Sequence, residues 1–380
     1  MNANRKKVVV VGAGLVGGTI AADLAIDFDV TAIDICQKNL NRVAQKAPVR
    51  TILADARNQD LLASLLEDTA YAVNAVPGWL GFKTLETIIS KRVNAVDIAF
   101  MPEDVLLLNK LAVNNNTIVI SDMGVAPGMS NLLAGYATIL LDKCESLEIL
   151  VGGLPKVRTW PWSYKAVFSP ADVIEEYLRP ARLVRNGKII TMPALSDSEL
   201  VDFETVGTLE AFNSDGLRSL VHTLSIPEMV EKTMRYPGHI ELIKALRHSG
   251  FFEKEPVMIN DILVEPIEFT SRLLFNQWQL NDGEPDITVM RVTARGLKNG
   301  KTINLVWELF DEYDNKLQVH SMARTTGYAA TAALRMMDTG LWSEPGIHVP
   351  ENIGMIQSCV EYLLREQANK GVIYKLLQQE

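Results

Sequence analysis

The sequence predicts an α/β fold: a doubly wound parallel sheet comes first, and a second domain with a mostly antiparallel sheet follows. Its 380 residues exceed what one core usually holds, because single cores stop growing near about 250–300 residues. From residue 7 to about 120, short β-branched runs alternate with helix-length stretches, which is the pattern of βα units. After Pro127 this alternation ends. We therefore expect two domains of different architecture.

Short apolar runs predict the strands of the first domain. They are expected at residues 7–11, 30–34, 49–53, 71–75, 95–98 and 117–120. Amphipathic stretches such as 58–66 and 80–90 lie between them, and the connections are short, as βα units require.

The remainder of the chain shows a different pattern. A helix is expected over 129–141 and a strand over 147–151, followed by a Gly-Gly-Leu-Pro turn at 152–155. Residues 156–260 are rich in Pro, Gly and isolated polar residues, which predicts loops that build a pocket. Asn299-Gly300 joins two strand-like runs and predicts a hairpin. A helix of small residues over 321–337 can pack closely, and the first domain is its expected partner.

Composition and charge exclude several classes of protein. Hydrophobic residues make up 48% and charged residues 22%, as in soluble globular proteins. The net charge of −9 repels phosphate backbones and anionic membranes, so we expect a small-molecule substrate and neither nucleic acid nor membrane as a partner. Three scattered cysteines and five histidines without metal-ligand spacing predict a reducing cytoplasm and no metal site.

A glycine motif directly after the first strand carries the sharpest chemical signal. It reads Gly12-Ala13-Gly14-Leu15-Val16-Gly17 and opens a helix. Gly12 allows the tight turn, Gly14 lets a pyrophosphate approach the backbone at the helix N-terminus, and Gly17 permits close helix–strand packing. Asp34, at the end of the next strand, stands where a carboxylate holds ribose hydroxyls. The strand before, the helix after and the acid disfavour the alternative of a glycine-rich turn with a solvent-facing aspartate.

The same aspartate favours NAD over NADP. Its charge repels a 2′-phosphate and no arginine follows it immediately, although the ammonium of Lys38 could reach a phosphate. Further cofactor contacts are expected after the third and fourth strands, where a capping or turn role is equally consistent. These candidates are Asp55, Ala56, Asn74, Val76 and Pro77.

Several segments together resemble the saccharopine dehydrogenase superfamily and, more narrowly, the lysine 6-dehydrogenases. They are the glycine motif, 122–129, 151–155, 164–169, 209–212, 235–239 and 322–325. The resemblance spans nearly the whole chain. The segments GVAPGM and RYxGH are fairly specific, whereas the glycine motif is shared by many dehydrogenases.

This resemblance implies an architecture, a reaction and a homo-oligomer, dimeric or tetrameric. Residues 1–125 form a Rossmann domain, 126–320 an inserted α/β domain with an open sheet that carries the substrate pocket and oligomer contacts, and 321–380 helices that return to the first domain. The implied reaction is NAD-dependent oxidative deamination of the ε-amine of L-lysine. Hydride leaves Cε, the iminium is hydrolysed with loss of ammonia, and the resulting 2-aminoadipate 6-semialdehyde can cyclise.

The chemistry of a zwitterionic amine substrate suggests which residues bind it. A carboxylate needs a cation, for which Arg235 is the candidate, with Arg218 or Lys165 in reserve if Arg235 only forms a salt bridge. An α-ammonium needs acceptors. The candidates are Asp215, Asn213 and Ser214.

Hydride transfer requires a neutral amine, yet the unperturbed lysine pKa is about 10.4. A base is therefore expected, and Asp97, Asp122 and His239 remain open as candidates. Tyr164 and Lys165 either polarise the amine or the hydrolytic water, or form the pocket wall.

Two alternatives to amine oxidation stay open. One is a reductase that joins an amine to an aldehyde, as saccharopine- or carboxynorspermidine-forming enzymes do; an extra arginine or lysine facing the nicotinamide would favour it. The other is a protein that binds NAD without turnover.

Overall fold

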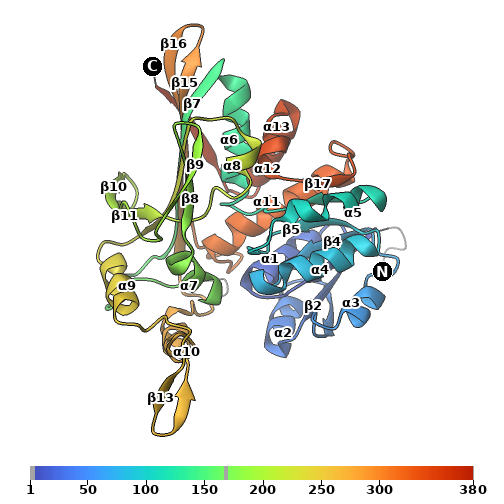
Figure 1. The fold of residues 1–380 in the computed structure, drawn as a ribbon. Coiled ribbons are helices and arrows are strands. Elements are labelled where there is room, and N and C mark those ends of the chain that lie inside the picture. The colour runs from blue at the N-terminus through green and yellow to red at the C-terminus, as the bar shows by residue number, and fades with distance from the viewer. Residues whose placement is uncertain (1–4, 167–169, 380) are drawn as a thin grey trace.

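The computed structural model describes residues 5–166 and 170–379, which form two large sheets (Figure 1). The first sheet is entirely parallel. Its order is β17 (Gly346–His348), β6 (Ile118–Ile120), β5 (Asn94–Asp97), β4 (Tyr71–Asn74), β1 (Lys7–Val11), β2 (Asp29–Asp34) and β3 (Arg50–Leu53). The strand ends lie within one or two residues of the predicted ones, so the doubly wound sheet is confirmed.

Helices cover both faces of this sheet. They are α1 (Leu15–Leu24), α2 (Gln37–Lys46), α3 (Gln59–Leu65), α4 (Gly78–Ser90), the 3-10 turn η1 (Val105–Leu108), α5 (Asn109–Asn114), α6 (Met129–Leu140), α11 (Ser321–Asp338), α12 (Pro350–Gly354) and α13 (Gln357–Ala368). Side chains of β1 alternate between two cores: Val8 and Val10 pack on one face, Val9 and Val11 on the other. A run of four valines is stable here because neither face of the strand meets water.

The C-terminal part of the chain returns to the first sheet. Strand β17 pairs in parallel with β6, and its three residues were too few to be predicted as a strand. Helix α11 packs on α1, where a Cβ added at Gly327 would lie 3.2 Å from Ile20 Cγ1. Ala329 and Ala330 belong to the same core as Val8. Small residues on α11 allow the two helices to approach closely.

The second sheet is mixed and mostly antiparallel. Its path runs β10 (Glu199–Phe203), β11 (Gly207–Asn213), β12 (Glu228–Arg235), β7 (Lys143–Pro155), β15 (Asp286–Lys298), β16 (Lys301–Glu312) and β18 (Tyr374–Gln379), while β8 (Ala181–Arg185) joins β12 and β9 (Lys188–Met192) joins β8. Among the described strands of this sheet, only β12 and β7 pair in parallel. Around this sheet lie α7 (Pro170–Leu178), α8 (Leu220–Thr223), α9 (His239–His248), α10 (Pro266–Trp278) and the small hairpin β13 (Val257–Ile259) and β14 (Ile262–Val264).

Two sequence predictions for this region are wrong. The glycines at 152 and 153 do not form a turn but lie inside the long strand β7. A Cβ at Gly152 would lie 3.0 Å from Met234 O, and one at Gly153 would lie 2.2 Å from Met322 Sδ. The glycines therefore mark close packing against the strand. As far as the structure describes them, residues 156–260 also carry six strands and three helices and are not mainly loops.

Two other predictions are confirmed. The Asn299-Gly300 pair joins β15 to β16 with φ of 53° and 77°, which is the left-handed pair that a two-residue hairpin turn requires. The helix expected over 129–141 is the buried helix α6. Of the helices in the described part of the chain, none combines the length and the apolar character that a membrane crossing needs.

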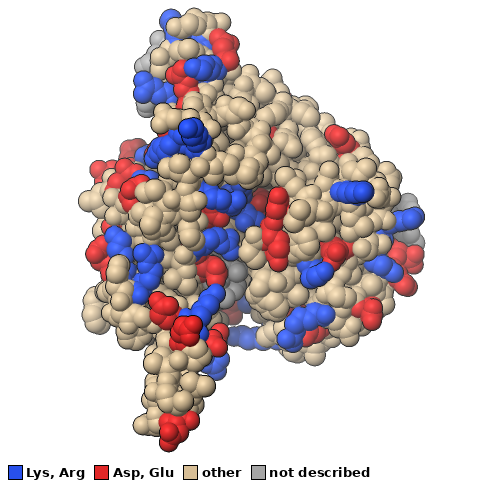
Figure 2. Space-filling model, in the orientation of Figure 1, with Lys and Arg blue, Asp and Glu red and all other residues tan. Residues whose placement is uncertain are grey.

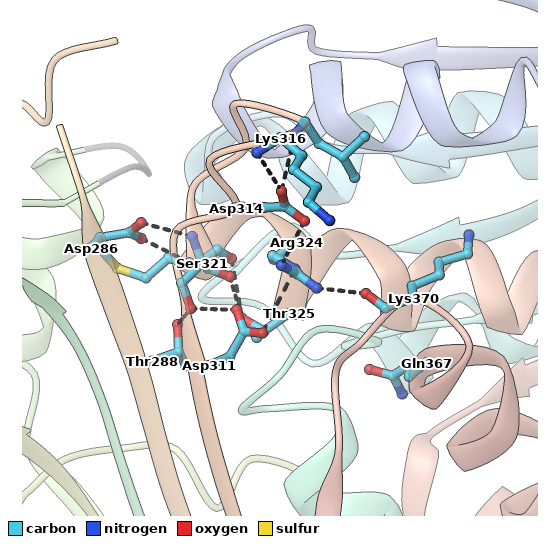
Figure 3. Close-up of polar contacts among 12 residues, drawn as sticks. Asp286, Thr288, Asp311, Asp314, Lys316, Ser321, Arg324, Thr325, Gln367 and Lys370 are labelled. Atoms are coloured by element: carbon cyan, nitrogen blue, oxygen red, sulfur yellow. Dashed lines mark hydrogen bonds and ion pairs between the residues drawn. The ribbon is translucent and has the colours of Figure 1, made fainter. Parts of the chain in front are cut away.

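A buried polar cluster attaches the start of α11 to the second sheet (Figure 3). Asp286 of β15 is fully buried and accepts hydrogen bonds from the backbone N–H groups of Ser321 and Met322, at 2.7 and 2.9 Å. Ser321 Oγ lies 2.7 Å from Asp311 Oδ2 and 2.9 Å from Thr288 Oγ1. Burial raises the pKa of Asp286 to about 6, although the two backbone donors oppose the shift. The cluster joins three elements at one point.

The capping role of Asp286 is testable. Asp286→Ala should lower the free energy of unfolding by about 1–3 kcal/mol, because two buried N–H groups lose their acceptor. Urea denaturation followed by circular dichroism would measure this. Glu312→Ala on β16 is the matched control, since that carboxylate is half exposed and pairs only with Lys156. Equal stability of the two variants would contradict the role.

Candidate functional site

A cavity of about 710 Å³ lies between the two sheets. One wall is made by the glycine loop between β1 and α1 and by the carboxyl ends of β2, β3 and β4; the other is made by β7, β12 and α7. Figure 2 shows charged side chains of both signs bordering the hollow between the two parts of the molecule. The cavity thus has a nucleotide-type wall and a charged wall facing it.

The geometry of the glycine loop fits a dinucleotide. Gly12 has φ of 96°, and a Cβ there would lie 2.3 Å from Ala75 O. A Cβ at Gly17 would lie 2.0 Å from Gly12 O, so this glycine permits the helix to pack on the loop. Gly14 has nothing within 4 Å of a built Cβ and lines the cavity, as do Leu15 and Val16. An open, bare backbone at a helix N-terminus is the surface that a pyrophosphate needs.

The acid after β2 is held in place by the loop itself. Asp34 Oδ2 accepts from Ala13 N and Oδ1 accepts from Cys36 N, both at 2.7 Å. The carboxylate lines the cavity, where Asn39 Nδ2 also lies 3.4 and 3.3 Å from its two oxygens. Asp55 also lines the cavity and forms a bidentate pair with Arg57, a cation that the sequence analysis did not consider near this acid.

The residues predicted after the third and fourth strands divide into two groups. Ala56, Val76 and Pro77 line the cavity. Asn74 lies behind its wall, where its Nδ2 donates to Asp97 Oδ1 at 2.7 Å.

Asp97 also lies behind the wall rather than on it. It is fully buried and accepts a bond from Ser121 Oγ at 2.7 Å in addition to the one from Asn74. Burial and the nearby charge of Asp122 raise its pKa to about 7. The carboxylate oxygens of Asp97 bind Asn74 at the end of β4 and Ser121 just after β6. Asp97 therefore links neighbouring strands at the carboxyl end of the sheet and does not line the cavity.

Asp122 does line the cavity, but it is paired. Arg218 Nε lies 3.1 Å from its Oδ2, and both side chains are buried. The guanidinium of Arg218 stacks 4.8 Å from the centre of the Phe100 ring. Asp122 has φ of 55°, which the surrounding bonds must hold.

Arg235 lies in an aromatic and acidic pocket at the other wall. Its Nε donates to Tyr177 OH, one Nη1 hydrogen goes to Met234 O, and Nη2 meets Tyr164 OH and Glu176 Oε2 at 3.3 and 2.8 Å. The guanidinium also lies 4.3 Å from the centre of the Tyr164 ring. A guanidinium has five N–H donors, so among the described residues one Nη1 hydrogen has no partner and could bind a ligand.

His239 lies behind this pocket as a neutral imidazole. Its Nδ1 lies 2.9 Å from Trp162 O, a pure acceptor, so Nδ1 carries the hydrogen and Nε2 accepts from Tyr177 OH at 2.9 Å. Burial, followed by the charge of Arg235, lowers its pKa to about 3. His239 therefore orients Tyr177, which in turn orients Arg235, and it does not line the cavity.

The remaining candidates also separate. Lys165 Nζ pairs with Glu284 at 2.7 Å and lies away from the cavity, and Asn213 Nδ2 binds Ser196 and Asp197. Ser214 and Asp215 line the cavity. Asp215 is already neutralised by Arg182 in a bidentate pair at 2.8 and 2.9 Å. Of the 164–169 segment, residues 167–169 lie outside the described residues.

Arg235 belongs to a row of side chains on β12, and the other two members, Glu231 and Thr233, were not predicted. Glu231, Thr233 and Arg235 alternate along the strand and all line the cavity. A strand rises about 3.3 Å per residue, so the backbone positions of Glu231 and Arg235 lie about 13 Å apart. The carboxyl of Glu231 and the guanidinium of Arg235 therefore mark the two ends of this wall. The two-residue period around Arg235 was the available signal. Glu176 and Arg179, on or just after α7, and Met322 and Thr326 of α11 also line the cavity and were missed.

The different roles of two glycines are testable. Gly14→Ala should leave the melting temperature of the cofactor-free protein unchanged but weaken dinucleotide binding about tenfold or more, since the new methyl group fills open space at the cavity. Gly17→Ala should lower stability by about 1–3 kcal/mol, because its Cβ would collide with Gly12 O. Thermal unfolding and fluorescence titration with NADH measure both. A stable Gly17→Ala protein with normal binding would contradict this assignment.

Comparison with known families divides the chain between β6 and α6, so that β17 of the first sheet falls within the second match. Residues 8–120 match the saccharopine dehydrogenase NADP binding domain, and residues 124–372 match the saccharopine dehydrogenase C-terminal domain. In structure the chain resembles apo saccharopine dehydrogenase (L-Glu forming) from Saccharomyces cerevisiae, with a TM-score of 0.81 and 18% identity over 99% of this chain and 100% of that one.

Curated relatives are distant. Rat mitochondrial alpha-aminoadipic semialdehyde synthase is 24% identical over 66% of this chain, and the match spans 29% of that protein's length. Yeast saccharopine dehydrogenase [NADP(+), L-glutamate-forming] is 23% identical over 70% of this chain and 63% of its own. Vibrio cholerae carboxynorspermidine synthase is 22% identical over 90% of this chain and 91% of its own. With both domain models matched in order along the chain, the protein belongs to the saccharopine dehydrogenase family.

Proposed function

We propose that the protein is an NAD-dependent dehydrogenase that oxidises the side-chain amine of an amino acid, with L-lysine as the substrate. The observation that carries this proposal is the cavity itself: the glycine loop and Asp34 form one wall, and the row of Glu231, Thr233 and Arg235 forms the other. When bound, the nicotinamide accepts a hydride. The family and its relatives, which are named for saccharopine, aminoadipic semialdehyde and carboxynorspermidine, agree with an amine or aldehyde as the reacting group.

The charges on the second wall suit an amino acid with a distant amine. The free Nη1 hydrogen of Arg235 would hold the carboxylate, and Glu176 beside it would accept from the α-ammonium. Burial raises the pKa of Glu176, while the charge of Arg235 opposes the shift. The side-chain amine would then extend along β12 toward Glu231. Released ammonia and the 2-aminoadipate 6-semialdehyde would be the products.

One observation favours a second candidate function, a reductase that joins an amine to an aldehyde. Arg179 lines the cavity in addition to Arg235, and its guanidinium lies 5.1 Å from the centre of the Phe100 ring, on which Arg218 also stacks. A second arginine would serve a second carboxylate. Incubation with reduced cofactor, an amino-acid aldehyde and an amine would yield a secondary amine if this function holds, and mass spectrometry would detect it.

The cofactor preference depends on Asp34. We expect the wild-type protein to have a higher kcat/KM with NAD than with NADP, because the fixed carboxylate accepts from ribose hydroxyls and repels a 2′-phosphate. Asp34→Ala should reduce this preference for NAD. In a variant that also lacks Asp55, Arg57 would lose its ion-pair partner and could bind the 2′-phosphate of NADP. Steady-state rates with the two cofactors test this. Equal kcat/KM in the wild-type protein would contradict the role of Asp34.

The substrate assignment depends on Arg235. The wild-type protein should reduce NAD with lysine and release an equal amount of ammonia. Arg235→Met should lower kcat/KM for lysine by a factor that corresponds to a loss of about 2–5 kcal/mol in transition-state stabilisation. The control substrate is 1,5-diaminopentane, which lacks the carboxylate. A true anchor makes the variant lose its discrimination between lysine and the diamine, whereas a structural role preserves it. Reduced cofactor without ammonia would exclude oxidative deamination.

A further inference from the structure

We propose that Glu231 is the group that accepts the proton from the reacting amine, and that this end of the cavity selects ligands bearing a cationic amine. The inference rests on the proposed amine oxidation and deepens it. The three residues that the sequence suggested as the base are less suitable. Asp97 and His239 lie behind the cavity wall, and Asp122 is paired with Arg218.

The Glu231 carboxyl is held by its neighbours with one oxygen left over. The residue is 3% exposed, and its Oε2 accepts from Ser214 Oγ at 2.8 Å and from Gly216 N at 3.0 Å. Thr233 orients Ser214 in turn, through contacts of its N and Oγ1 with Ser214 Oγ at 2.8 and 2.7 Å. Within the described part of the chain, Oε1 has no hydrogen-bond partner. That oxygen is available to a ligand in the cavity that Glu231 lines.

Gly216 shows that the fold reserves this place for a carboxyl group. A Cβ built on Gly216 would lie 2.4 Å from Glu231 Cδ and 2.5 Å from its Oε2. A side chain at position 216 would displace the carboxyl group of Glu231 from this place. The glycine therefore fixes the direction of Glu231 as well as its hydrogen bond.

Glu231 differs from the other carboxyl groups on this side of the cavity because it lacks an arginine partner among the described residues. The pairs are Asp122 with Arg218, Asp215 with Arg182, Glu176 with Arg235, and Glu175 with Arg179 at 3.9 Å. A carboxyl buried without a cation is costly when ionised. A cationic amine arriving in the cavity would supply the missing charge.

The surroundings of Glu231 also raise its pKa toward that of an amine. Burial raises its pKa to about 8; Glu176 from α7 and Asp215 from the loop before α8 add to the shift, and the Ser214 and Gly216 donors oppose it. The cations that face this region, Arg182 and Arg235, are each engaged with those two acids. An ordinary glutamate near 4.3 is a poor acceptor for a proton from an amine near 10.4, and a pKa of about 8 narrows that gap.

The proton step balances without a further reactant. An N–H bond of the substrate ammonium breaks and an O–H bond forms at Glu231. The freed nitrogen lone pair then stabilises the carbon from which the hydride would leave, with both electrons, to the NAD that the proposed function requires. Water then adds to the resulting iminium, and ammonia leaves as the aldehyde forms. Glu231 returns its proton to ammonia or to solvent before the next turnover.

Matched variants on one strand test this step. Glu231→Gln keeps the shape but cannot accept the proton, so kcat/KM with lysine should fall about a hundredfold or more and the rise in rate centred near pH 8 should disappear. Glu228→Gln, at the start of the same strand, removes a partly exposed carboxylate that pairs with Arg185 and should change kcat/KM less than twofold. Gly216→Ala keeps the charge but displaces the carboxyl, and should lower kcat/KM without removing the ionisation.

Calorimetry supplies a readout that does not need turnover. At pH 7, Glu231 is mostly protonated, so binding of lysine or 1,5-diaminopentane without cofactor should release close to one proton, measured from heats in buffers of different ionisation enthalpy. Glu231→Gln should release none. Proton release that persists in Glu231→Gln, or its absence from the wild-type protein, would overturn the assignment. Proton release without any reduction of NAD would refute the proposed dehydrogenase and leave the amine site standing.

Discussion

The attachment of α11 to both sheets is the constraint on which the cavity depends. At its start, Asp286 of β15 accepts the first backbone N–H groups of the helix, and Ser321 lies between Thr288 and Asp311 (Figure 3). Farther along, small residues of the same helix pack on α1 beside the glycine loop. A helix that is fixed to one sheet and buried against the other sets the distance between the two walls. The bare backbone of β7 at Gly153, which Met322 fills, lets that distance be short.

Within this frame, the second wall is polarised along one strand. Arg235 is surrounded by Tyr164, Tyr177 and Glu176, and the carboxylate of Glu176 balances its charge. Among the described residues, a single N–H donor of its guanidinium is left for a ligand. Glu231 lies four residues before Arg235 on the same face of β12. Its Oε1 has no hydrogen-bond partner among the described residues. The behaviour of His239 follows from the same design: a buried imidazole beside a buried guanidinium stays neutral and orients a tyrosine instead of transferring protons.

The elements that could be predicted from the sequence were those whose pattern is local. Four valines followed by the glycine motif indicated a strand and a loop that a pyrophosphate can approach; the structure has this strand and a loop with open space at Gly14. Asn299-Gly300 identified its hairpin because only certain residues adopt two left-handed conformations in succession. Glycines at 152 and 153 were misread as a turn, since their reason is a contact with side chains 80 and 169 residues away. Strand β17 was missed because three residues carry no period of their own.

The parallel sheet and the nucleotide-type loop follow from the sequence alone, because each depends on neighbours in the chain. Which charged groups meet the cavity, including those around Arg235, depends on tertiary contacts. Asp97 and His239 turned out to lie behind its wall, Asp122 and Asp215 to be paired with Arg218 and Arg182, and Glu231 to be without such a partner in the described chain. Burial and pairing fix the charge of a side chain, and both are set by residues that are distant in sequence.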